Sequence, residues 1–274
     1  DADAARTRDG RHRLQRLDRK ARAALGVAAV GVGALIRSRT EELHRQETRG
    51  GVQFHAVEAR LERAARGMGA SHARGFAAEG AKVVLTDTRV EEGAALAASI
   101  GPSALFVAHD VASAAGWADV VREAQAAFGE PEVLVNNAGI TNRKRILEYS
   151  VEEWQQIIDG NLTSTFLVAR TVVPGMIERG YGKVINIGSV LSELGRVMNA
   201  PYASTKGGIR MLTRAMCAEW APLGIQANAI GPGYFSTELT KVLEDDAEFS
   251  AWLRARIPSG RWAQPEELAG AVVF

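Results

Sequence analysis

Residues 65–108 of the chain read ARGMGASHARGFAAEGAKVVLTDTRVEEGAALAASIGPSALFVA. Two short apolar runs in this stretch, residues 82–86 and 105–108, are separated by a pattern of helical length. Further strand candidates of the same kind follow at residues 133–135, 183–187 and 226–230. Buried strands that alternate with helices are typical of βαβ units, so the sequence predicts an α/β fold with a doubly wound parallel sheet.

Helices are predicted in the intervening stretches, at residues 71–79, 90–99, 113–128, 151–179, 202–221 and from 265 onward. Sheets of this kind bind ligands beyond the carboxyl ends of their strands. We therefore expect the unusual residues that directly follow each strand to form the functional site.

The composition is that of a globular chain, with 46% hydrophobic and 24% charged residues among 274 and a single cysteine. It excludes collagen-like and disordered proteins and any intramolecular disulfide framework. The single Cys217 fits a reducing compartment, so we expect a cytoplasmic protein. The net charge of +1 gives no reason to expect a nucleic-acid partner.

The first 64 residues differ from the rest in charge. They carry 14 Lys and Arg against 9 Asp and Glu, whereas residues 65–274 carry 19 against 23. Their one long apolar run, residues 23–36, is shorter than the about 20 residues that span a bilayer. No small-residue cleavage site of a signal peptide follows it. We predict a basic N-terminal extension over residues 1–64 that is not a compact domain, and no membrane association.

Glycines precede the first helix of the α/β region. Gly67, Met68 and Gly69 would let a pyrophosphate approach the backbone at a helix N-terminus, although two glycines alone could form an ordinary turn. Asp87 follows the next strand, where a carboxylate can accept hydrogen bonds from an adenosine ribose. Arg66 beside the loop could instead meet a 2′-phosphate. The pattern favours NAD as the cofactor, with NADP possible.

Two other motifs follow strands. Asn136, Asn137, Ala138 and Gly139 come directly after residues 133–135, where they form either a plain turn or a loop that faces a cofactor.

Tyr202 and Lys206 are four residues apart, so they share one face of a helix. The lysine ammonium, with a cationic nicotinamide ring, would lower the pKa of the phenol enough to make it a base. Ser189, after another strand, is either a cap or turn residue or part of this site.

The motifs occur in a characteristic order: Gly67 to Gly69, Asp87, Asp110, Asn136 to Gly139, Asn161, Ser189, Tyr202-x-x-x-Lys206 and Pro232-Gly233-x-x-x-Thr237. In this order, residues 65–274 resemble the short-chain dehydrogenase/reductase family of Rossmann-like, NAD(P)-dependent oxidoreductases. The resemblance implies a dinucleotide-binding domain over residues 65–274.

The resemblance also implies site residues. The catalytic ones would be Asn161, Ser189, Tyr202 and Lys206. Those that contact the cofactor would be Arg66, Gly67, Met68, Gly69, Asp87, Asp110, Asn137, Ala138, Gly139, Lys206, Pro232, Gly233 and Thr237. His72 and His109 lack the spacing of metal ligands, and we expect no metal.

Within the family, residues 192–196, 210–217, 231–240 and 251–253 are similar to gluconate 5-dehydrogenases, whereas residues 65–74 are similar to hydroxysteroid-type members. We therefore predict reversible oxidation of a secondary alcohol on a sugar acid such as gluconate, with 5-ketogluconate as the ketone. The basic run of residues 143–145 is either a solvated turn or a carboxylate site; in the second case Arg143 would hold the substrate carboxylate while Ser189 and Tyr202 meet the hydroxyl. The alternatives are a keto-acyl or hydroxysteroid reductase, or a catalytically impaired remnant with an assembly or regulatory role.

The chain departs from the family in two places. Glu62 and Arg63 stand where the family has Thr-Gly, and residues 57–61 form a poor buried strand, so we expect the first strand of the family to be missing. Residues 52–57 could pair beside residues 82–86 as a replacement. The chain also stops at Phe274, ahead of the usual last strand. We predict a sheet incomplete at both ends and weak binding of NAD. The long helix over residues 151–179 would pair between subunits in a homotetramer or homodimer.

Overall fold

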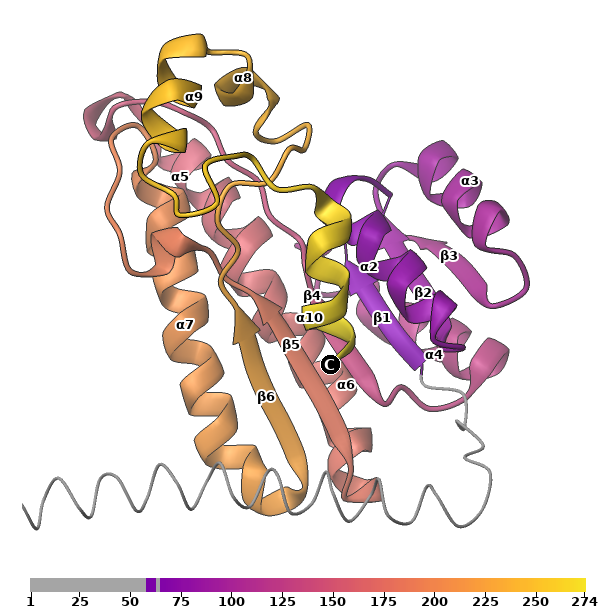
Figure 1. Ribbon diagram of the computed structural model, residues 1–274. Coiled ribbons are helices and arrows are strands. Elements are labelled where there is room, and N and C mark those ends of the chain that lie inside the picture. Colours follow the sequence, from indigo (N-terminus) through magenta and orange to yellow (C-terminus); the bar gives the residue numbers. More distant parts are fainter. Residues whose placement is uncertain (1–57, 63–64) are drawn as a thin grey trace, which may run out of the picture. The chain divides into compact units, whose positions relative to one another are not determined.

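The computed structural model describes residues 58–62 and 65–274, and everything that follows concerns these residues (Figure 1). Most of the predicted N-terminal extension, residues 1–57 and 63–64, lies outside the described residues. The strand expected at residues 52–57 and Arg63 fall in this part. For residues 58–62 only the path of the backbone is described.

Six parallel strands form one sheet in the described part of the chain, in the order β3-β2-β1-β4-β5-β6. Their bounds are β1 Glu58–Glu62, β2 Lys82–Asp87, β3 Ala104–Ala108, β4 Val133–Asn136, β5 Gly182–Ile187 and β6 Ile225–Ile230. The order reverses between β1 and β4, which is the switch point of a doubly wound sheet. The predicted fold class is therefore confirmed, and five of the six strands lie within a residue or two of the stretches predicted.

The prediction that the sheet lacks its central first strand is wrong. The backbone of β1 pairs with β2, from Glu58 opposite Lys82, and also with β4, from Ala59 opposite Val133. A stretch that is poor in apolar residues was not recognisable as a buried strand. Pairing along both edges overrides a weak local preference, as it commonly does in the centre of a sheet. This strand lies within the first 64 residues, so the sheet begins before the glycine motif.

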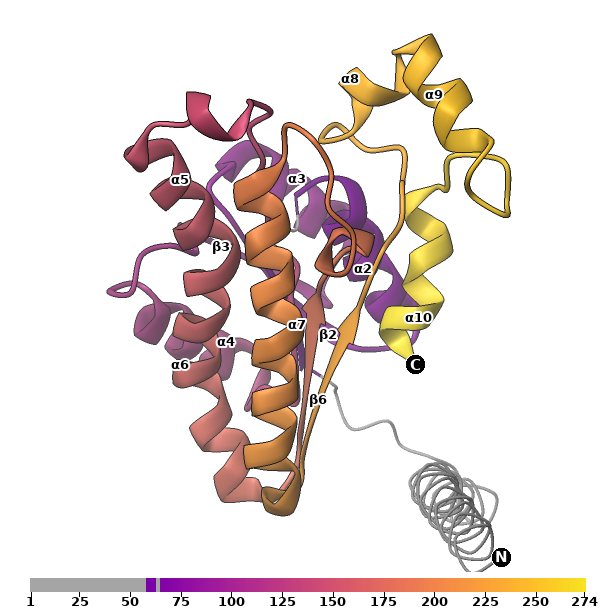
Figure 2. The same cartoon turned by 90° about the vertical axis from the view of Figure 1, so that its left-hand side faces the viewer.

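Helices cover both faces of the sheet, and Figure 2 shows α4, α6 and α7 on one face and α2 and α10 on the other. The helices are α2 Gly67–Ala78, α3 Val90–Ile100, α4 Trp117–Phe128, α5 Val151–Ile158, α6 Ser164–Arg179, α7 Ala200–Trp220, α8 Lys241–Glu244, α9 Ala247–Arg254 and α10 Ala269–Val273. Short 3₁₀ turns are η1 Ile146–Glu148, η3 Val190–Ser192, η4 Ala221–Leu223 and η5 Pro265–Leu268.

The alternation of side chains along the strands produces two separate cores. Val84 of β2 packs with Trp117 and Met176 on the α4, α6 and α7 side. Its neighbours Val83 and Leu85 point the other way and pack against α2, α3 and α10. Successive residues of a strand face opposite sides, so a strand that is apolar throughout is covered on both.

The predicted helix over residues 151–179 is interrupted. α5 ends at Ile158, a π-helical turn, η2 Asp159–Thr163, follows, and α6 continues from Ser164. One extra residue per turn in such a bulge turns a side chain out of the regular helical path. The residue in the middle of this turn is Asn161.

The segment after β6 carries two short helices, α8 and α9, that the sequence did not predict. They pack around a small third core of Leu243, Leu253 and Trp262, and Phe235 forms an isolated bridge with Ala263. This segment lies beyond the carboxyl ends of the strands (Figure 1). None of the helices in the described residues is long and apolar enough to cross a bilayer.

Candidate active site

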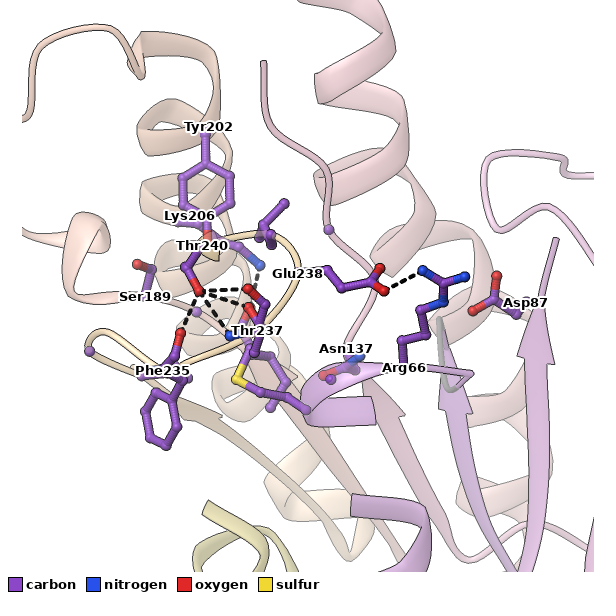
Figure 3. Close-up of a pocket in the computed structure, with 18 of the residues that line it drawn as sticks. Arg66, Asp87, Asn137, Ser189, Tyr202, Lys206, Phe235, Thr237, Glu238 and Thr240 are labelled. Carbon is purple, nitrogen blue, oxygen red and sulfur yellow. Dashed lines mark hydrogen bonds and ion pairs between the residues drawn. The ribbon is translucent and has the colours of Figure 1, made fainter. Parts of the chain in front are cut away.

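An open cavity of about 580 Å³ lies at the carboxyl ends of the strands (Figure 3). Its walls come from segments that are far apart in sequence: the glycine motif, the end of β2, the turns after β4 and β5, the first turns of α7 and the segment after β6. Most residues predicted for the site line it, namely Arg66, Gly67, Met68, Asp87, Asn137, Gly139, Ser189, Tyr202, Lys206, Pro232, Gly233 and Thr237.

Lys206 lies at the base of this cavity and is 3% exposed. Its ammonium donates a hydrogen bond to the Ile187 carbonyl oxygen at 2.6 Å and lies 5.6 Å from the centre of the Tyr202 ring. Burial lowers the pKa of Lys206 from 10.5 to about 8. A Cβ atom at Gly139 would lie 3.7 Å from this ammonium, so the loop after β4 passes directly beside it.

Tyr202 lies in the first turn of α7, which Pro201 helps to start because proline suits this position of a helix. Burial raises the pKa of the Tyr202 phenol above its usual value, while a hydrogen bond with the Ser189 side chain and the charge of Arg143 oppose this. The expected lowering of this pKa is therefore absent from the protein alone. The other cation expected to lower the pKa of Tyr202, the nicotinamide ring, belongs to the cofactor.

Ser189 follows β5 and caps the turn η3, because its side chain accepts a hydrogen bond from the Leu191 N–H at 3.1 Å. Its side chain also lowers the pKa of the Tyr202 phenol. The capping and functional roles considered for this serine therefore coexist. Ser189 and Tyr202 both line the cavity (Figure 3).

Asn161 is 1% exposed and binds the backbone of the loop after β4 through both ends of its amide. Its Oδ1 accepts from the Ile140 N–H at 2.7 Å, and its Nδ2 donates to the Ile140 carbonyl at 2.9 Å and to Thr205 at 3.2 Å. The π-helical turn thus aims this side chain between the loop and α7. Asn161 fixes the wall of the cavity that carries Gly139, although it does not line the cavity itself.

The cofactor end of the cavity is built around Asp87, which is 6% exposed. Its Oδ2 accepts from the Ala65 N–H at 3.2 Å and its Oδ1 from the Arg89 N–H at 3.1 Å. Each carboxylate oxygen can accept a second hydrogen bond. The Asp87 side chain can therefore still bind the hydroxyls of a ribose that enters the cavity.

The start of α2 suits an anion. Gly67 has a φ of +54°, in the left-handed region that glycine tolerates, and a Cβ atom there would lie 3.5 Å from Thr237. The first N–H groups of a helix have no acceptor within the helix, and here the Arg66 carbonyl first accepts from Ala70. The donors at this end, Asp87 and Lys206 together fit a nicotinamide dinucleotide.

Five of the predicted site residues do not line the cavity: Asn161, Asp110, Gly69, Ala138 and Arg143. Asp110 is exposed, accepts from the Ala112 N–H at 3.0 Å and does not line the cavity. Gly69 and Ala138 are buried behind its wall. Asn136 is 3% exposed and donates to Asn186 at 2.7 Å, which links β4 to β5.

Sequence reasoning did not single out several residues of the cavity wall, namely Thr88, Arg89, Ile187, Gly188, Phe235, Glu238, Leu239 and Thr240. Thr240 shapes the segment after β6, since its hydroxyl accepts from the Thr237 N–H at 3.0 Å and donates to the Phe235 carbonyl at 2.5 Å. The only signal in the sequence was the position of these residues just after strands.

Two arginines lie outside the lining of the cavity: Arg143, whose charge acts on the Tyr202 phenol, and Arg196, whose charge acts on Arg143. Arg143 donates to the Leu239 carbonyl at 3.0 Å, and its buried Nε has no partner among the described residues. Burial, together with repulsion by Arg196, lowers the pKa of Arg143. Arg196 donates to the Tyr234 hydroxyl at 3.3 Å. The two positive charges repel each other, and that of Arg143 favours the phenolate of Tyr202.

Comparison with known proteins agrees with this geometry. A family model described as enoyl-(acyl carrier protein) reductase matches residues 64–274. The 5-keto-D-gluconate 5-reductase of Escherichia coli (strain K12) is 42% identical over 213 residues, which cover 77% of this chain and 84% of that protein. A 3-alpha-(or 20-beta)-hydroxysteroid dehydrogenase of Mycobacterium tuberculosis (strain ATCC 25618 / H37Rv) is 44% identical over 210 residues, 77% of this chain and 78% of the relative.

Solved structures of gluconate dehydrogenases also resemble this chain. A gluconate 5-dehydrogenase from Burkholderia cenocepacia J2315, in complex with NADP and tartrate, is 46% identical and superimposes with a TM-score of 0.77. The match covers 80% of this chain and 87% of that protein.

Proposed function

The chain belongs to the short-chain dehydrogenase/reductase family, and we propose that it oxidises a secondary alcohol of a sugar acid such as gluconate, reversibly, with 5-ketogluconate as the ketone. One observation carries the choice of substrate: the charge of the Arg143 guanidinium acts on the Tyr202 phenol, and a second guanidinium, that of Arg196, acts on Arg143. A carboxylate is the group that such a pair of guanidinium forks binds best.

The reaction divides among few side chains. Tyr202 accepts the proton of the substrate hydroxyl, and Ser189, which lines the same cavity, orients the same oxygen. The ammonium of Lys206 stabilises the phenolate as it forms. Asn161 keeps the loop beside Lys206 in place through Ile140. The nicotinamide supplies the chemistry of hydride transfer when it is bound.

Arg143 and Arg196 would fix which hydroxyl reaches Tyr202. A carboxylate held by both guanidinium groups places the far end of a short sugar acid over the phenol. Its negative charge also offsets the repulsion that lowers the pKa of Arg143. A substrate without an anionic group leaves this charge uncompensated in a partly buried site, which costs binding energy.

We favour NAD over NADP as the cofactor. Asp87 lies at the end of β2, where it can bind ribose hydroxyls, and its carboxylate would repel a 2′-phosphate. The relative from Burkholderia cenocepacia carries NADP, so both dinucleotides belong in any binding test.

A hydroxysteroid is the second candidate substrate, because the relative from Mycobacterium tuberculosis is 44% identical to this chain. A keto-acyl substrate is the third. Neither uses a pair of arginines next to the reacting hydroxyl, so both are less well supported by Arg143 and Arg196. The hypothesis of a catalytically impaired remnant rested partly on a missing first strand. It is weakened because β1 lies in the centre of the sheet, between β2 and β4.

Assembly and location complete the proposal. Phe166 on α6 is 50% exposed and Met211 on α7 is 55% exposed, which suits a homodimer or homotetramer that pairs through these helices. The exposed, unpaired Cys217 suits the reducing cytoplasm.

The test is a comparison of substrates on the purified chain. We expect kcat/KM with NAD to be highest for gluconate, ahead of a hydroxysteroid and a keto-acyl thioester. A preference for the steroid would overturn the substrate and leave the catalytic residues standing. Absence of turnover with all three, in a chain that unfolds cooperatively, would favour the remnant hypothesis.

A further inference from the structure

Four charged side chains form a cluster at the cofactor end of the cavity: Arg66, Arg89, Glu92 and Glu238. Arg66 donates to both carboxylate oxygens of Glu92 through Nε and Nη2, and to Glu238 through Nη1. Figure 3 shows the contact between Glu238 and Arg66 beside Asp87. Arg89 Nη1 lies 3.3 Å from Glu92 Oε2 and 3.7 Å from Glu238 Oε2. Two positive charges are therefore matched by two negative ones.

The backbone places both arginines next to Asp87. One oxygen of the Asp87 carboxylate binds the N–H of Ala65, which precedes Arg66, and the other binds the N–H of Arg89. Arg66, Arg89 and Glu238 line the same cavity as Asp87. The charge cluster therefore surrounds the carboxylate that we propose holds the adenosine ribose.

Free guanidinium groups in this position would attract a phosphate, which arginine binds through two parallel hydrogen bonds. Here the forks of Arg66 are already filled by Glu92 and Glu238. A 2′-phosphate would have to displace a carboxylate and would then lie near three acidic groups. A ribose with a free 2′-hydroxyl meets neither obstacle.

We propose that Glu92 and Glu238 are specificity-determining residues that select the dinucleotide without a 2′-phosphate, by occupying Arg66 and Arg89. This inference rests on the proposed function, in which the cavity binds a nicotinamide dinucleotide. Glu238 has a second consequence, because it adjoins Thr237 on the segment after β6. Its contact with Arg66 ties that segment to the glycine motif across the cavity.

Binding titrations of the full chain with NAD and with NADP test this, by calorimetry and without substrate. The variants are Glu92→Gln, Glu238→Gln and the double substitution, which keep the side-chain shape and remove the charge. We expect each single change to raise the affinity for NADP about tenfold, the effect of one freed charge-assisted contact, and to change the affinity for NAD less than about twofold.

Two further variants act as controls. Glu130→Gln removes a matched surface carboxylate, paired with Arg179 at 3.1 Å and remote in sequence and structure from this cavity, and should leave both affinities unchanged. Adding Arg66→Gln to the double variant should abolish the gain for NADP, because the freed guanidinium is then gone. Thermal unfolding of each variant confirms that it is folded.

Other outcomes overturn the inference. An unaltered ratio of the two affinities in the variants, or an equal change in both, would show that the glutamates do not select the cofactor, while gluconate oxidation by the unaltered chain would leave the proposed function intact. Tighter binding of NADP than of NAD by the unaltered chain would also overturn it. If neither dinucleotide binds, the cofactor site itself fails.

Discussion

The Lys206 ammonium donates a hydrogen bond to the Ile187 carbonyl oxygen over 2.6 Å, and this contact joins α7 to the end of β5. A single carbonyl replaces only part of the water shell of an ammonium, so burial lowers the pKa of Lys206 to about 8. The same ammonium lies 5.6 Å from the centre of the Tyr202 ring. The site thus contains a buried cation close to the group that must become an anion.

Lys206→Met should separate catalysis from stability. We expect kcat to fall by at least about 100-fold, because the phenolate loses the nearby charge. The melting temperature should stay within a few degrees, since burying an ammonium is itself costly. Calorimetry and initial rates measure the two effects. Lys241→Met, which removes an exposed lysine paired with Asp245 at 2.6 Å, is the control and should retain full kcat.

Lys206→Met should also change how the free energy of unfolding depends on pH. Folded Lys206 loses its proton at about 8 and the unfolded lysine at about 10.5, so the unfolded state binds more protons between these values. The contribution of this residue to the free energy of unfolding therefore rises with pH across that window. Lys206→Met should lack the rise; identical profiles would contradict the lowered pKa.

Tyr202→Phe should abolish turnover and spare the cofactor. The substitution removes the proton acceptor, but it leaves Asp87 and the start of α2, which we propose bind the cofactor, unchanged. We expect kcat to fall by about 1,000-fold or more, as is usual when a catalytic base is lost. The dissociation constant for NAD should change less than about twofold. Substantial remaining activity would assign the base to another group.

The sequence predicted most of this fold because parallel strands buried on both faces are continuous apolar runs. β2 is of this kind, and two residues expected at the site, Asp87 at the end of β2 and Ser189 after β5, line the cavity. β1 carries too little apolar sequence to be recognised, and only its pairing with β2 and β4 defines it. Local patterns cannot report pairing with strands that are distant in sequence.

The orientation of Asn161 shows the same limit at the site. The apolar spacing over residues 151–179 predicted one continuous helix, yet a π-helical turn divides it. Gly160 and Asn161 are the only local signal, since both are weak helix formers. The charge cluster was also beyond the sequence, because Glu238 is 172 residues from Arg66.

We expect the free energy of unfolding to fall in acid because of His72. It is 0% exposed, neither ring nitrogen has a hydrogen-bond partner among the described residues, and burial lowers its pKa to about 4. The unfolded histidine takes up a proton near pH 6.5, so the fold loses up to about 3 kcal/mol as the pH falls from 6.5 to 4. His72→Leu should remove this part of the pH dependence in denaturant titrations. An unchanged acid limb would refute the assignment to His72.

Gly224→Ala should destabilise the edge of the sheet. Gly224 has a φ of +85°, and a Cβ atom there would lie 2.0 Å from the Gly180 carbonyl oxygen, which is backbone and cannot turn aside. We expect a loss of about 3 kcal/mol or more, from strain and from a forced shift of the start of β6. Gly260→Ala is the control, because its φ is +64° with nothing within 4 Å. It should cost only about 1 kcal/mol. Equal losses would exclude the steric cause.

Arg143→Ala should raise KM for gluconate more than it lowers kcat. The charge of Arg143 acts on the Tyr202 phenol, and its hydrogen bond goes to the Leu239 carbonyl. Because a guanidinium stays protonated, it cannot accept the substrate proton, and we expect Arg143 to act on substrate binding. If Arg143 and Arg196 both bind the substrate carboxylate, removing the Arg143 guanidinium should raise KM about 10- to 100-fold. Arg196→Ala should act in the same direction and more weakly, because that guanidinium also contacts Tyr234 and Phe249.

The control for these arginines is Arg122→Ala, which removes an exposed arginine of α4 paired with Asp119 and should leave KM unchanged. A neutral substrate gives the sharper comparison. If the pair binds a carboxylate, Arg143→Ala should reduce kcat/KM for gluconate and leave that for an uncharged polyol unchanged. An equal loss for both substrates would mean that Arg143 holds the segment after β6 in place through Leu239, and the choice of a sugar acid would then lose its support.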